Sequence, residues 1–240
     1  MPRVLGVDGA RGGWVFASLS PALELTFSSS IESFFASHQE ACQCILIDMI
    51  MGLPFSPETL RPEAMIHDLL GRHSASIFRV PCRASVYAEN ITDMYRLHET
   101  IMHQKLTPFS INLIPKIKEL DIWLRYHQEM QSVIFESHPE SAFELLNSER
   151  LKHSKHTKDG LQERFELLRS RIPDLSLPSL QAFSKQHRLP LDDVLDAIVL
   201  AYTAELYLSG QARLIPPHPQ ADEYGILMRA ILPCPAKTPS

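Results

Sequence analysis

Apolar residues gather near the start of the chain in short runs that are typical of β-strands. The first run covers residues 3–8, and a glycine-rich turn separates it from a second run over 14–19 and a third over 23–27. Strands joined by such short connections pair as antiparallel neighbours. A continuous apolar run over 44–49 is typical of a strand buried on both faces of a sheet. The pattern predicts a three-stranded meander followed by a central strand.

Helical periodicity dominates the rest of the chain. Apolar residues at helical spacing predict helices over 31–38, 58–70, 90–104, 114–127, 139–146, 160–170 and 192–208. A further strand is expected over 132–136, where the chain turns apolar again. We interpret residues 56–127 as a helical insertion within a single α/β domain that spans residues 1–240.

Carboxylates stand where the predicted strands end. Asp8 and Asp48 each close an apolar strand, and Glu136 closes a third. Open α/β sheets build their sites at such strand ends. Asp193 and Asp196 lie at the start of the last helix, on one face of it because they are three residues apart. That face continues with apolar residues, so Asp196 is expected to face the sheet, where a carboxylate needs a partner.

Acids that converge on one place need a counter-charge, and hard divalent cations supply it through oxygen ligands. Two such ions can clamp an in-line phosphoryl displacement. The acids therefore predict a metal-dependent hydrolase that uses Mg²⁺ or Mn²⁺. Simpler roles stay open for each acid taken alone, because an aspartate also forms turns, caps helices and pairs with cations.

The charge of the chain is unevenly distributed. Its 240 residues carry a net charge of −5, so broad, non-specific binding to a nucleic-acid duplex is not expected. The segment 150–171 is locally basic, with seven basic side chains against three acidic ones. Lys155, Lys158 and Arg164 in this segment, and Arg11 in the first turn, are candidates for phosphate contacts. An exposed charged surface is the equal alternative.

The sequence shows no sign of a membrane or secretory protein. No apolar run reaches the length that a membrane span needs, and the first residues lack the pattern of a secretory signal. The four cysteines lack the spacing of a zinc site. We therefore expect a cytoplasmic protein without a membrane partner.

An ordered series of motifs extends along nearly the whole chain. The motifs cover residues 6–14, 47–54, 76–83, 115–121, 135–140, 154–164, 193–197 and 224–226. This series resembles the bacterial and archaeal domain-of-unknown-function family 429, which is described as predicted ribonuclease-H-like nucleases. The resemblance implies a ribonuclease-H-like α/β fold: a mixed five-stranded sheet, three antiparallel strands first, flanked by helices. It also implies that Asp8, Asp48 and either Asp193 or Asp196 hold metal, with Glu136 as a further acid, and that residues 224–226 form a closing strand.

Three functions follow from these observations. The lead prediction is a metal-dependent nuclease that hydrolyses phosphodiester bonds, with nucleic acid as its partner. A phosphotransferase of the actin and sugar-kinase type is the second, but it requires another glycine-rich phosphate loop, and the later glycines Gly160, Gly210 and Gly225 are not paired. The third is a non-catalytic binding or scaffold protein on the same fold, in which the acids serve structure.

Overall fold

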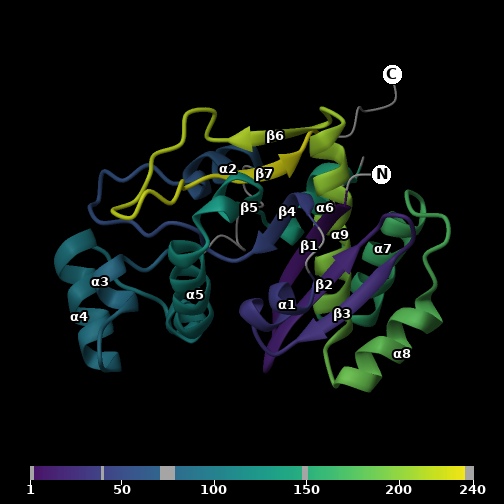
Figure 1. Cartoon of the computed structure of the whole chain (residues 1–240), viewed down its shortest axis with the longest axis horizontal. Helices are drawn as coiled ribbons and strands as arrows, with labels where there is room; N and C mark the ends of the chain where they lie inside the picture. The colour runs from purple at the N-terminus through teal and green to yellow at the C-terminus, as the bar shows by residue number, and fades with distance from the viewer. Residues whose placement is uncertain (1–2, 39–40, 71–78, 148–150, 236–240) are drawn as a thin grey trace. The chain divides into compact units, whose positions relative to one another are not determined.

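The computed structural model describes residues 3–38, 41–70, 79–147 and 151–235 (Figure 1). Residues 76–78 of one motif and Arg150 of the basic segment lie outside the described residues. The chain divides into two compact units, and residues 56–127 fall within the second. The first unit comprises Met1–Asp48, Val133–Arg213 and Ile231–Ser240, and the second comprises Met49–Ser132 and Leu214–Ala230.

The strands of the described residues form one mixed sheet of seven strands in the order β3-β2-β1-β4-β5-β7-β6. Their bounds are β1 Arg3–Ala10, β2 Gly13–Ser18, β3 Glu24–Ser28, β4 Cys42–Asp48, β5 Ile134–Glu136, β6 Ala212–Ile215 and β7 Ala230–Pro233. The first three strands pair antiparallel, as expected, while β4 runs parallel to β1 and β5 runs parallel to β4. The expected number of five strands is wrong, because β6 and β7 extend the sheet beyond β5.

The closing strand lies later in the chain than expected. Residues 224–226 form a turn instead of a strand, and Gly225 there has a φ of +80°, which favours glycine. The side chain of Asp222 holds this turn, because its Oδ1 accepts the N–H groups of Tyr224 at 2.9 Å and Ile226 at 3.0 Å. An aspartate that bonds nearby backbone amides in this way competes with strand pairing. The last described strand is β7.

Helices account for most of the remaining described residues. In the first unit they are α1 Ile31–Ser37, α6 Pro139–Leu146, α7 Lys158–Arg169, α8 Leu177–His187 and α9 Leu191–Leu208; in the second they are α2 Pro62–Leu70, α3 Arg83–Val86, α4 Ile91–Met102 and α5 Pro108–Tyr126. The hydroxyl of Ser30 caps α1 as expected, because it accepts the N–H of Ser33 at 3.0 Å. No helix among the described residues is long and apolar enough to cross a membrane.

Helix α9 packs directly against β1, and a glycine makes this contact possible. A Cβ atom at Gly6 would lie 2.0 Å from the carbonyl oxygen of Ala197 and 2.2 Å from the amide nitrogen of Ala201. Only a residue without a side chain allows the two backbones to approach so closely. Side chains alternate along a strand, so Asp8 lies on the same face of β1 as Gly6. The contact therefore places the end of β1 beside the first turns of α9.

The second unit has its own buried network of charges. The guanidinium of Arg83 donates to both carboxylate oxygens of Asp121 at 2.9 Å and also pairs with Asp222. Oδ2 of Asp222, which pairs with Arg83, also accepts a hydrogen bond from the N–H of Leu53 at 3.1 Å. These bonds tie α3 and α5 to the segment around residue 222 within this unit.

Candidate metal centre

Asp8 and Asp48 lie directly opposite each other on neighbouring parallel strands. The register of β1 and β4 pairs the two residues, and each stands at or near the end of its strand. Opposite residues of paired strands point to the same face, so both carboxylates lie on the face that carries α9. Asp8 is 5% exposed, whereas Asp48 is partly exposed.

Asp196 adds a third carboxylate from α9. It is 1% exposed, which agrees with the expectation that it faces the sheet. Burial raises the pKa of Asp8 well above its usual range, and repulsion from the carboxylates of Asp48, Asp196 and Asp193 raises it further. Burial likewise raises the pKa of Asp48. The structure thus brings together, on one face of the sheet, four of the five acids that the sequence singles out.

Lys155 lies among these acids. Its ammonium nitrogen is 2.7 Å from Oδ2 of Asp196 and donates a hydrogen bond to it. Burial opposes the charge of Lys155, but the carboxylates of Asp196, Asp48 and Asp8 outweigh this effect, so its pKa is raised. Lys155 therefore stays protonated beside the acids and compensates part of their negative charge.

The second carboxylate oxygen of Asp196 is in a different situation. Oδ1 is buried and has no hydrogen-bond partner among the described residues. Burial raises the pKa of Asp196 to about 7 although Lys155 opposes this change. A buried acceptor without a partner is costly to keep and suits a ligand atom for a cation.

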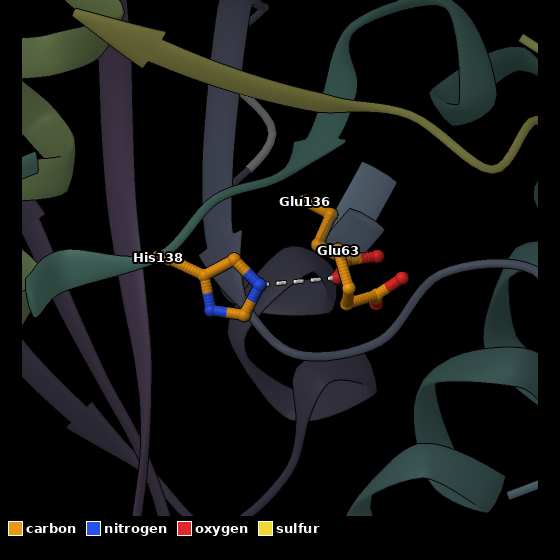
Figure 2. Close-up of side chains that lie close together, drawn as sticks. All are labelled: Glu63, Glu136 and His138. Atoms are coloured by element: carbon orange, nitrogen blue, oxygen red, sulfur yellow. Dashed lines mark ion pairs between the residues drawn. The ribbon is translucent and has the colours of Figure 1, made fainter. Parts of the chain in front are cut away.

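Glu136 does not join the other acids directly. It pairs in register with Ile47, the neighbour of Asp48 along β4, and therefore points to the opposite face of the sheet. His138 lies between the two groups: its Nε2 is 3.6 Å from Oε1 of Glu136 (Figure 2), and its Nδ1 is 3.9 Å from Oδ1 of Asp48. Glu63, also drawn in Figure 2, belongs to the second unit.

His138 was not among the residues selected from the sequence. Its only signal there is its position, two residues after Glu136 and directly before Pro139, which begins α6. From the sequence, that position is more typical of a residue that precedes a helix for structural reasons. The structure adds that the side chain of His138 is 11% exposed and lies within ion-pair distance of two acids.

The four candidate phosphate-binding residues have different surroundings. Lys155 lies at the acids, whereas Arg11 is exposed in the β1–β2 turn and Lys158 is exposed at the first position of α7. Arg164 is 2% exposed, and its guanidinium pairs with both oxygens of Glu140 at 2.9 and 2.7 Å. It also donates to the carbonyl groups of residues 153 and 160. The guanidinium of Arg164 is thus used inside the first unit.

Comparison with known proteins gives one clear result. The family model described as "Protein of unknown function (DUF429)" matches residues 6–221, which contain all the acids of the candidate metal centre. No curated protein matches the chain, and no solved structure does. Since the family model covers most of the 240 residues, the chain belongs to the DUF429 family.

Proposed function

We propose that this protein is a hydrolase that cleaves phosphodiester bonds of nucleic acid with the help of Mg²⁺ or Mn²⁺. The observation that carries the proposal is the meeting of Asp8, Asp48 and Asp196 on one face of the sheet, with one buried oxygen of Asp196 lacking a hydrogen-bond partner among the described residues. These three residues would hold the metal, with Asp193 beside them.

The donor set fits a hard divalent cation. All of its ligand atoms are carboxylate oxygens, which Mg²⁺ and Mn²⁺ prefer. Burial raises the pKa values of Asp8 and Asp196, repulsion from neighbouring carboxylates raises them further, and Lys155 offsets only part of these effects. A cation bound there would offset both the burial of these carboxylates and their mutual repulsion.

The bound metal would supply Lewis acidity and an activated water for attack on phosphorus. The chain supplies a rigid frame, because Asp8 and Asp48 are fixed by neighbouring strands and Asp196 by the close packing of α9 on β1. Lys155 favours the ionised form of Asp196 and holds its carboxylate in place through a hydrogen bond. Arg11 and Lys158 are exposed and stay candidates for contacts to the phosphates of the substrate.

One observation also favours a non-catalytic alternative. The hydrogen bond between Lys155 and Asp196 compensates part of the acidic charge without any metal. In a binding or scaffold protein, the main role of these acids would be to form this ion pair and so stabilise the fold. Such a protein needs no metal to reach its folded state and cleaves no substrate.

An assay of nucleic-acid cleavage tests the proposal. Labelled single-stranded and duplex DNA and RNA are incubated with Mg²⁺ or Mn²⁺ and the wild type, Asp8→Asn or Asp48→Asn. Asp192→Asn is the matched control, because Asp192 lies on α9 and pairs with the exposed His156 at 3.4 Å. We expect metal-dependent cleavage by the wild type and the control. The cleavage rates of Asp8→Asn and Asp48→Asn should be lower by about 100-fold or more. Absence of cleavage of every substrate by metal-loaded protein would favour the non-catalytic alternative.

A further inference from the structure

The second unit contains a cavity that takes no part in the candidate metal centre. Its volume is about 620 Å³, which is within the range of pockets for small molecules. Its lining residues come from the segment that precedes α2, from α2 itself, from the segment that precedes α3, and from α4 and the residues after it. Leu60, Val80 and Met102 give it apolar walls, and Arg79 and His98 are among its polar lining residues.

His98, one of the lining residues, carries a buried hydrogen-bond donor. The residue is 1% exposed, and its Nδ1 accepts the backbone N–H of Cys82 at 3.1 Å. Burial lowers the pKa of His98 to about 4, and the nearby charge of Arg79 contributes, so the ring is neutral at pH 7. A neutral ring that accepts at Nδ1 carries its proton on Nε2.

Nε2 of His98 is buried and lacks a hydrogen-bond partner among the described residues. Leaving such a group unsatisfied destabilises the folded protein. A ligand atom that accepts from Nε2 would remove this cost.

Arg79 provides a positive charge near the same place. Its side chain is exposed, and one of its nitrogens donates to the carbonyl of Lys105 at 2.8 Å. A guanidinium has five N–H groups, so the bond to Lys105 leaves capacity for a ligand. Arg61, the other arginine of the lining, is engaged by Glu63 at 2.7 Å and by backbone carbonyls.

We propose that this cavity binds a small organic carboxylate. Its oxygens would accept hydrogen bonds from Nε2 of His98 and from Arg79, while its apolar part packs against Leu60, Val80 and Met102. A single negative charge fits better than a phosphate dianion, because Glu58 and Glu63 also line the cavity and would repel additional charge. The proposal is independent of the proposed nuclease function, since every residue that it uses lies in the second unit.

Titration of the full chain with hexanoate, followed by two-dimensional NMR, tests this site. Hexylamine and hexyl phosphate have the same apolar tail with other head groups. We expect saturable binding of hexanoate with a dissociation constant of about 1 mM or tighter. Weaker binding is expected for hexyl phosphate, and none for hexylamine.

Three variants locate the binding. His98→Asn keeps an acceptor for the N–H of Cys82 but lacks Nε2, and Arg79→Met removes the charge from an exposed position. Each is expected to weaken hexanoate binding about tenfold, the usual effect of losing a hydrogen bond to a charged group. Arg96→Met is the matched control, because Arg96 is exposed on α4 and pairs with Asp93. It should bind hexanoate like the wild type.

Several outcomes would overturn the proposal. These are absence of saturable hexanoate binding, equal binding of hexylamine, tighter binding of hexyl phosphate, or unchanged hexanoate affinity in Arg79→Met. If His98→Asn fails to fold, Arg79→Met decides the question alone, because its substitution lies on the surface.

Discussion

The ammonium of Lys155 donates a hydrogen bond of 2.7 Å to one carboxylate oxygen of Asp196, while the other oxygen is buried without a hydrogen-bond partner among the described residues. The two oxygens of one side chain thus have opposite environments. Lys155 compensates part of the charge that β1, β4 and α9 bring together, which allows these acids to be buried in the folded chain. The remaining oxygen is available for a cation.

Replacing Lys155 should destabilise the protein. In Lys155→Met the carboxylate of Asp196 stays buried among other acids and loses its counter-charge. Breaking a buried ion pair costs about 3 kcal/mol, and we expect a decrease of this size in the free energy of unfolding by urea at pH 8. Lys158→Met is the control, because Lys158 is exposed. Equal stability of the two variants would show that Lys155 does not compensate the acids.

The stability of the protein should depend on pH through Asp196. Its pKa is about 7 in the folded protein against a usual value of 3.8. Between these values the folded state binds more protons than the unfolded state, so the free energy of unfolding falls as pH rises. For each unit by which the pKa is higher in the folded state, ionisation of the carboxyl group lowers the free energy of unfolding by about 1.4 kcal/mol. Asp196→Asn lacks this group, and we expect it to gain stability relative to the wild type from pH 4 to pH 7.

Urea unfolding of the wild type and Asp196→Asn over this pH range measures the effect. The difference in unfolding free energy should grow up to about pH 7 and then level off. Parallel curves for the two proteins would contradict a raised pKa at Asp196.

The close contact of β1 with α9 should not tolerate a side chain at Gly6. Gly6→Ala would put a Cβ atom 2.0 Å from the backbone of Ala197, so strand and helix would have to separate. We expect a loss of about 3 kcal/mol or more in thermal or urea unfolding. A Cβ atom at Gly12 would meet open space, but the φ of +80° there is strained for alanine. For Gly12→Ala we therefore expect a loss of only about 1 kcal/mol in the free energy of unfolding. A similar effect in both variants would argue against the packing contact.

Arg164 should matter for stability. Arg164→Met would leave Glu140 and two backbone carbonyls without their buried donor, at a cost of about 3 kcal/mol. Arg169→Met removes the same charge from the exposed end of α7 and should be nearly neutral. Urea unfolding compares them. If Arg164→Met is as stable as Arg169→Met, the buried bonds to Glu140 have no structural role.

Much of the first unit could be predicted because its elements are long or strongly patterned. The meander, the buried strand β4 and helix α9 follow from local apolar patterns, and the position of Asp196 follows from helical spacing. The placement of Asp8 beside Asp48 required only that two strands end at the same edge of a sheet. These features depend on periodicity, which a single sequence contains.

Other features depend on contacts that are distant in sequence. Strands β6 and β7 have four residues each, too few to show a period, and α8 has only Leu180 as a buried residue. Lys155 and Arg164 belong to the same basic segment, yet one lies at the acids and the other pairs with Glu140. Only the folded chain distinguishes them, because their partners lie 41 and 24 residues away.

Direct binding of Mn²⁺ at pH 7.5, followed by electron paramagnetic resonance of the free ion, tests the central claim most directly. We expect saturable binding by the wild type and by Asp192→Asn, and loss of that binding in Asp8→Asn. We expect Asp8→Asn to fold, because the substitution removes a buried carboxyl group whose pKa is raised by burial and repulsion. Equal Mn²⁺ binding by Asp8→Asn and the wild type, or no binding by any of the three proteins, would contradict a metal centre at Asp8, Asp48 and Asp196.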